Sequence, residues 1–201
     1  MFTQNANEIF QRAIDDYHRH DNVDQPIENP LAKNSIQALL YQKCWIDAVQ
    51  WHLEDIIRDP LIDPVAALAL KRRIDASNQV RTDMVEYIDS YFLNEYKGVK
   101  PAADARLNTE TPAWAIDRLS ILALKVYHMR REALRKDVAD EHRAACQAKL
   151  NVLLTQQVDL SQSIEELIDD LSTGRKAMKV YKQMKMYNDP ALNPVLYASK
   201  K

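Results

Sequence analysis

The sequence predicts an all-α fold: an antiparallel bundle of about five to six helices, three of them long, followed by an irregular C-terminal tail. Apolar residues recur at alternating spacings of three and four through long stretches without proline, which is the periodicity of a helix with one buried face. No stretch shows the two-residue alternation of a strand. The eight prolines that separate these stretches fall in four places: Pro26 and Pro30, Pro60 and Pro64, Pro101 and Pro112, and Pro190 and Pro194.

Prolines and capping residues set the expected helix boundaries. We expect a first helix over residues 3–20 and a second over residues 33–58. Asp63 before Pro64, and Thr111 before Pro112, each place a capping side chain ahead of a first-turn proline. These pairs predict a third helix that ends near residue 96 and a fourth that ends near residue 136.

The fifth helix is expected to end at Gly174, because glycine is suited to a left-handed helix cap. Residues 137–140 contain neither glycine nor proline, so the fourth and fifth helices could be continuous, but we expect a break there. A short sixth helix is expected over residues 175–186, ahead of the tail.

Composition indicates one domain over residues 1–201. We divide it into an N-terminal helix and loop (1–28), a bundle core (29–188) and a proline-containing tail (189–201). Hydrophobic residues make up 46% of the chain and charged residues 28%, which is enough for a core without a disulfide or a metal. The apolar seams of the third and fifth helices predict bundle packing, with a coiled-coil dimer as the alternative.

Composition also excludes several classes of protein. Two glycines cannot build the phosphate loops of P-loop and Rossmann proteins. A net charge of −2 gives no general attraction to nucleic acid, and no stretch approaches the ~20 apolar residues that span a bilayer. We therefore expect no nucleic-acid binding and no membrane insertion. Cys44 and Cys146 form no CxxC motif, which is typical of a protein of the reducing cytoplasm.

Polar residues form stripes on the second, third and fourth predicted helices. Asp, Asn and Thr are mediocre helix formers, so their concentration on the third helix favours a buried network or a ligand site over a solvated face, which is the alternative interpretation. On the second helix, Lys43, Asp47, Gln50 and Glu54 share a face. The candidate ligand-binding residues are Glu54, Lys71, Asp75, Asn78, Gln79, Arg81, Asp83, Arg118, Lys125 and His128.

Treating neighbouring helices as straight antiparallel hairpins predicts which of these side chains meet. The expected pairs are Glu54 with Lys71, Asp47 and Gln50 with Asp75, His128 with Asn78 and Gln79, Lys125 with Thr82 and Asp83, and Arg118 with Asp89.

The spacing of metal-binding residue types does not favour a metal site. Residues 86–89 form an ExxD pair like one half of the Mg²⁺ site of all-α nucleotide pyrophosphohydrolases, but the other half is missing. His52 with Asp55, and His18 with His20, have possible zinc spacing without an HExxH motif or a cysteine set. We predict no metal and no cofactor; the alternative is a divalent cation held by Glu54, Asp75 and Asp83.

Four separated segments resemble one bacterial family. They are QWHLEDIIRD (50–59), KRRIDASNQVRTDMVEYID (71–89), NTETPAWAIDRLSILALKVYHM (108–129) and KMYNDPALNPVLY (185–197). The family is catalogued as domain of unknown function 4254, and the resemblance covers about residues 29–197. It implies a helical protein with no established activity, so no catalytic residue is implied. Ala113 stands where the family usually has glycine. The resemblance also implies a link to glycosyltransferases of envelope synthesis.

Two functions remain as hypotheses. The first is a non-catalytic protein that binds a protein partner or self-associates, which is favoured because no complete catalytic set can be assembled from the sequence. The second is an enzyme or binder for a small anionic ligand, bearing a phosphate or a carboxylate, with a polar pocket between the second, third and fourth helices.

Overall fold

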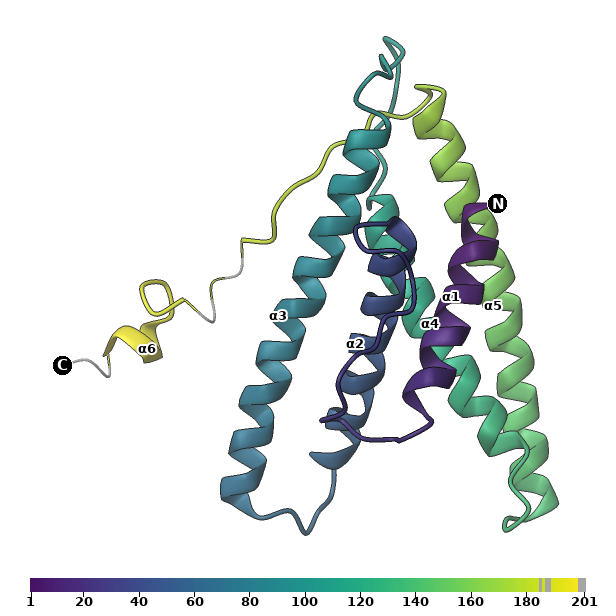
Figure 1. The fold of residues 1–201 in the computed structure, drawn as a ribbon, viewed down its shortest axis with the longest axis vertical. Helices are drawn as coiled ribbons and strands as arrows, with labels where there is room; N and C mark the ends of the chain where they lie inside the picture. The colour runs from purple at the N-terminus through teal and green to yellow at the C-terminus, as the bar shows by residue number, and fades with distance from the viewer. Residues whose placement is uncertain (185, 187–188, 199–201) are drawn as a thin grey trace.

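The structure is a computed structural model that describes residues 1–184, 186 and 189–198. These residues form six helices: α1 (Phe2–Tyr17), α2 (Ile36–Ile56), α3 (Pro64–Glu95), α4 (Pro112–Ala133), α5 (Asp140–Ser172) and α6 (Pro194–Ala198). The first five form a bundle in which α4 contacts α1, α2, α3 and α5 (Figure 1). Within the described part of the chain, extended residues pair only at an isolated bridge between Arg106 and Lys176. The all-α prediction is therefore confirmed.

Side-chain caps begin three of the helices. The Ser35 hydroxyl accepts a hydrogen bond from the backbone N–H of Ala38, so α2 begins at Ile36, slightly later than expected. Asp63 and Thr111 cap α3 and α4 as predicted, with a proline in the first turn of each helix. The predicted break between α4 and α5 is also present.

The core lies where α1, α2, α4 and the C-terminal half of α3 pack together. Its largest fully buried side chains include Phe10, Tyr17, Tyr41 and Phe92. Burying each such side chain contributes about 1.5–3 kcal/mol, so this cluster carries much of the stability of the bundle.

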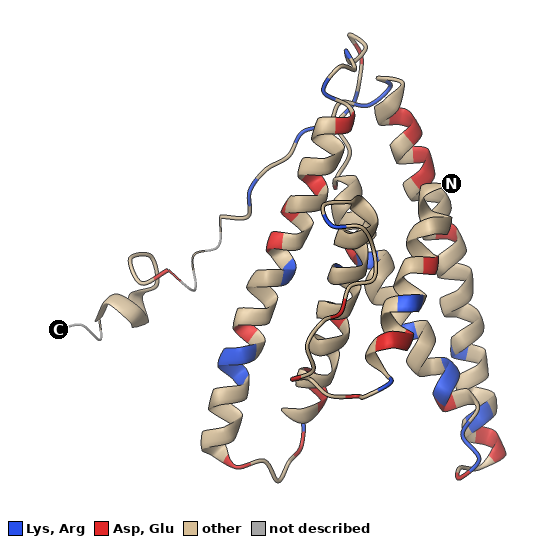
Figure 2. Ribbon diagram, viewed as in Figure 1, with Lys and Arg blue, Asp and Glu red and all other residues tan. Residues whose placement is uncertain are grey.

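Helix α3 belongs to the bundle only in part. Its buried residues lie almost entirely in its C-terminal half, whereas Ile74 is the only buried residue in the N-terminal half. That half diverges from the other helices in Figure 1. Figure 2 shows most of the acidic residues of α3 in its C-terminal half and most of the basic ones in its N-terminal half. Arg81 lies near the point where α3 leaves the bundle.

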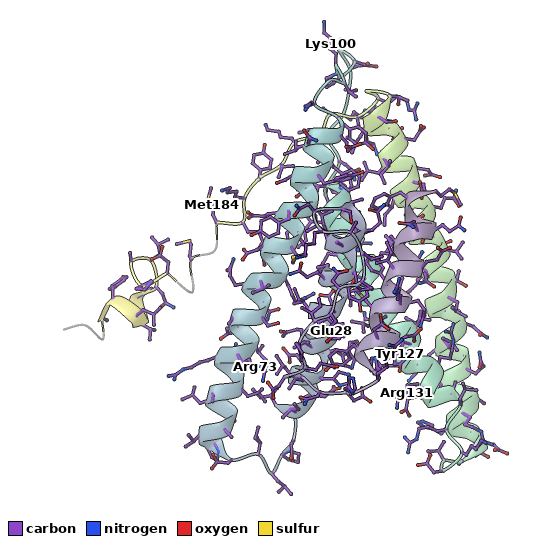
Figure 3. All side chains as sticks on the ribbon, viewed as in Figure 1. Glu28, Arg73, Lys100, Tyr127, Arg131 and Met184 are labelled. Atoms are coloured by element: carbon purple, nitrogen blue, oxygen red, sulfur yellow. The ribbon has the colours of Figure 1, made fainter. Side chains whose placement is uncertain are left out.

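The predicted helix over residues 175–186 is wrong for the part that the structure describes; Lys185 lies outside the described residues. Gly174 is left-handed, with φ 75°, and the chain after it is extended. The backbone N–H of Ala177 donates to the Arg106 carbonyl at 3.0 Å, so this segment bonds to a loop instead of to itself. It then leads away from the bundle past Met184 (Figure 3), and the tail contains α6, which the sequence did not predict. No described helix is both long and apolar enough to cross a membrane.

Candidate functional site

Four charged residues form a network where α2, α3 and α4 meet. Lys43 is fully buried, and its Nζ lies 2.5 Å from Asp47 Oδ2 and 2.7 Å from Asp117 Oδ1. Arg81 Nε donates to Asp47 Oδ1 at 2.6 Å. The Ser120 hydroxyl also donates to Asp47, at 2.6 Å. Two cations and two carboxylates neutralise one another, so the network joins three helices without a net charge.

Arg81 is the cation of the network that lines a cavity. Burial lowers its pKa, but nearby Asp47 and Asp117 raise it by more, so the net direction is upward and the guanidinium stays charged. Its Nη1 donates to Asn78 Oδ1 at 3.1 Å. Its Nη2 lies 3.7 Å from Asp117, which is too far for a direct hydrogen bond. The Nη2 hydrogens are therefore the donors that Arg81 can offer to a ligand.

A cavity of about 360 Å³ lies beside the network, between α2, α3 and α4. This volume is within the range of small-ligand sites. Trp51, Ile121 and Leu124 supply apolar wall, and the polar residues that line it are Asp47, Gln50, Glu54, Asp55, Arg58, Asn78 and Arg81.

Gln50 carries the one clear sign of a missing partner in this cavity. The residue is 6% exposed, and its Oε1 has no hydrogen-bond partner among the described residues. Its Nε2 donates to Glu54 Oε1 at 3.3 Å, which orients the amide. An unpaired buried carbonyl costs about 1–3 kcal/mol, so a donor that reached this oxygen after a small rotation of the amide would satisfy it.

Three histidines meet on the other side of Trp51. His18 follows the last residue of α1, His52 lies on α2 and His128 lies on α4. One nitrogen from each lies within 4.8 Å of the others. They form the only such group of three possible metal ligands within residues 1–184, 186 and 189–198. The Trp51 ring stacks on His128, with centroids 4.7 Å apart, and so separates this cluster from the cavity.

The structure places the ten candidate residues in four different surroundings. Glu54, Asn78 and Arg81 line the cavity between α2, α3 and α4, and Asp75 lines an adjoining hollow with Asp117. Lys71 pairs with Asp75, and Gln79 with Asp83, along the α3 surface. Arg118 and Lys125 line a larger groove between α4 and α5, and His128 belongs to the histidine cluster. Glu54, Asp75 and Asp83 form no group that could hold a metal in the described part of the chain.

Three of the contacts expected from hairpin geometry are wrong, by about two helical turns. Asp47 contacts Arg81 instead of Asp75. Asp89 accepts a hydrogen bond from Thr111 instead of lying by Arg118, which pairs with Glu110. His128 lies by His18 and Trp51, not by Asn78 and Gln79.

Among the residues that the structure describes, neither the cysteine nor the serine beside the network is an activated nucleophile. Burial raises the pKa of the Cys44 thiol to about 12, so the thiol is protonated at neutral pH. The Ser120 hydroxyl donates to Asp47, with no histidine within this arrangement to take its proton. The network therefore presents charged and polar side chains, of which neither Cys44 nor Ser120 is activated as a nucleophile.

Sequence reasoning missed Lys43, Asp47 and Asp117 as site residues, although the stripe on the second helix contains the first two. It weighed His18 and His52 only with their sequence neighbours His20 and Asp55, because no short motif joins them to His128 on a separate helix. The side chain of His52 is 25% exposed.

Comparison with known proteins finds a family but no characterised relative. No curated protein and no solved structure matches the chain. The model of a family described as a protein of unknown function, DUF4254, matches residues 37–180, which include α2, α3, α4, α5 and most of the residues described above. The chain therefore belongs to the DUF4254 family.

Proposed function

We propose that this protein binds a small zwitterionic molecule that carries a carboxylate, such as a free amino acid, in the cavity between α2, α3 and α4. The observation that carries the proposal is the buried, unpaired Oε1 of Gln50 in the cavity wall. Because this oxygen only accepts, the ligand must bring an N–H or O–H donor to it.

The charges of the cavity favour a zwitterion over a multiply charged anion. Arg81 and Arg58 are its two cations, and Asp47, Glu54 and Asp55 are its three carboxylates. Arg58 is paired with Glu54 at 3.2 Å, and Arg81 with Asp47. A phosphate group would meet no uncompensated positive charge. A carboxylate can instead accept from Arg81 Nη2 while an ammonium group donates to Gln50 and Glu54.

Thermal unfolding in the presence of defined compounds tests this proposal. The panel consists of free amino acids, pyruvate as a carboxylate without an ammonium group, inorganic phosphate, and UDP-glucose because of the family's implied link to envelope glycans. A ligand at a hundred times its Kd adds about 2.7 kcal/mol, which raises Tm by roughly 5–10 °C for a domain of this size. We expect this shift from an amino acid. No shift from any amino acid, or a shift from phosphate alone, would contradict the proposal.

Gln50→Leu gives the matched structural test. The leucine keeps the volume of the glutamine and removes the unpaired oxygen, so the free protein should be as stable as the wild type or more so. The stabilisation by the ligand should fall from about 2.7 kcal/mol to between about 0.3 and 1.4 kcal/mol at the same ligand concentration. Gln147→Leu on the exposed face of α5 is the control, and it should leave the shift unchanged.

Self-association is a second candidate function, and a different observation favours it. The turn between α2 and α3 and the first turns of α3 expose Leu61, Val65 and Leu68, which are 90%, 77% and 54% accessible. Val65 and Leu68 belong to the N-terminal half of α3, and the ribbon of this half diverges from the bundle (Figure 1). Light scattering of the purified protein tests this candidate. A wild-type dimer that becomes a monomer in the double variant Val65→Ser, Leu68→Ser supports it, and a wild-type monomer at high concentration refutes it.

A further inference from the structure

The arrangement of His18, His52 and His128 has no role in the cavity described above. The Nε2 atoms of His18 and His52 lie 3.3 Å apart. Two nitrogen ligands at about 2.0–2.1 Å from a tetrahedral zinc ion lie roughly 3.3–3.4 Å from each other. The observed separation therefore equals the spacing that a shared metal ion requires.

Hydrogen bonds orient the rings so that their free nitrogens converge. His18 Nδ1 contacts the carbonyl oxygen of Ile14 at 2.7 Å. A carbonyl oxygen only accepts, so Nδ1 carries the hydrogen and Nε2 of the neutral ring carries the lone pair. This pattern, in which the second ring nitrogen donates to a backbone carbonyl, is the one that fixes metal-binding histidines.

His128 adds a buried nitrogen that has no partner. Its Nε2 is inaccessible to solvent and makes no hydrogen bond with the described residues. This unpaired nitrogen lies beside the two other histidine rings, so the described residues leave it unsatisfied at the centre of the cluster.

Aromatic neighbours hold the three rings in place. His52 stacks on Tyr17 with centroids 5.3 Å apart, and His128 stacks on Trp51. His18 packs 4.2 Å from the ring of Tyr127, which lies toward the end of α4 near Arg131 (Figure 3). Packing of this kind explains why the rings are rigid, but it does not satisfy the unpaired Nε2 of His128.

Two aspartates complete the surroundings. Asp21 Oδ1 lies 3.7 Å from His18 Nε2, and its half-exposed side chain can rotate toward the cluster. Asp55 Oδ2 lies 3.7 Å from His52 Nδ1, on the side of that ring away from His18 Nε2. Asp21 lies outside the group formed by the three histidine nitrogens and would reach a shared ion by rotation of its side chain, whereas Asp55 lies on the outer side of His52.

We propose that His18, His52, His128 and Asp21 bind one zinc ion or a chemically similar divalent transition metal, which fastens the end of α1 to α2 and α4. Three nitrogen ligands and one carboxylate match the preference of zinc.

Zinc titration of the full-length, chelator-treated protein tests the proposal by calorimetry and by Tm. We expect one zinc ion per chain and a rise in Tm on binding. His52→Gln and His128→Gln should each weaken zinc binding by more than the 10–100-fold that follows loss of an outer-shell partner. His20→Gln is the control, because His20 is exposed and close in sequence, and it should bind zinc as the wild type does.

The circular dichroism of each zinc-free variant shows whether it is folded. If a variant fails to fold, cobalt(II) bound to the wild type provides an independent measurement. We expect the intense visible absorption of a tetrahedral site with nitrogen and oxygen ligands, displaced by one equivalent of zinc. Absence of a zinc-dependent rise in Tm, unchanged affinity in both variants, or the weak absorption of octahedral cobalt would overturn the proposal.

Discussion

Replacing Lys43 with methionine tests whether the buried charge network stabilises the contact between α2, α3 and α4. Methionine keeps an unbranched side chain of similar length, so the change removes the charge and leaves little empty space. Asp47 retains Arg81 and Ser120 as partners. Asp117 loses its close cation, because Arg81 Nη2 is 3.7 Å away.

The expected loss follows from the burial of the pair. The side chain of Lys43 is 0% exposed, and that of Asp47 is 1% exposed. Removing one partner of such a buried pair costs about 3–5 kcal/mol, because a charge is left uncompensated. For a domain of this size the loss should lower Tm by roughly 6–20 °C.

Urea unfolding followed by circular dichroism measures the free energy of unfolding of Lys43→Met and of a matched control. Lys71→Met is that control, since Lys71 pairs with Asp75 on the exposed surface and should contribute less than about 1 kcal/mol. Adding Asp117→Asn to Lys43→Met should recover part of the loss by removing the stranded carboxylate. A loss under about 1 kcal/mol for Lys43→Met, or no recovery in the double variant, would refute the assignment.

Three further predictions concern single side chains. The pKa of Asp89 is raised to about 6 by burial, against 3.8 for an exposed aspartate, so the folded state binds its proton more tightly. The resulting stability is present below about pH 3.8 and is lost as the pH rises through about 6. Asp89→Asn should therefore be more stable than the wild type by about 1–3 kcal/mol at about pH 8 but not at about pH 3.5, and equal pH dependence of both proteins in urea unfolding would contradict this. Gly174→Ala should lower the free energy of unfolding by about 1–2 kcal/mol or more, because φ is 75° and the new Cβ would lie 2.8 Å from the Lys100 carbonyl oxygen. Gly98→Ala is the control, since its Cβ meets nothing within 4 Å. Thermal unfolding compares the two variants, and equal Tm values would be inconsistent with this prediction. Burial raises the pKa of the Cys44 thiol to about 12, so a thiol reagent should leave Cys44 unmodified until the protein unfolds. Rapid labelling of Cys44 in the native protein, measured by mass spectrometry, would disprove this prediction.

Local features of the fold were predictable from the sequence because they depend on few neighbouring residues. Asp63 with Pro64, and Thr111 with Pro112, begin helices through their own side-chain and backbone geometry. Residues 175–184 were mistaken for a helix because their conformation depends on the distant Arg106, to which Ala177 is hydrogen-bonded.

The candidate site was predictable only in part, since it depends on how helices are aligned. The sequence indicated that polar residues of α2, α3 and α4 would meet, and Glu54, Asn78 and Arg81 do line one cavity. The partners were misassigned because the long irregular connection over residues 96–111 does not act as a tight turn, which shifts α4 along α3. The histidine cluster depends in addition on the irregular connection between α1 and α2, whose path no short motif specifies.

One calorimetric experiment tests most directly whether the cavity between α2, α3 and α4 is a binding site. The wild type and Gln50→Leu are each titrated with the amino acid that most raises the Tm of the wild type. A hydrogen bond from a charged group to the Gln50 oxygen is worth about 1.5–3 kcal/mol. We predict one site per chain in the wild type and an affinity roughly 10–150-fold lower in Gln50→Leu. Equal affinity in the two proteins would contradict the assignment of this cavity.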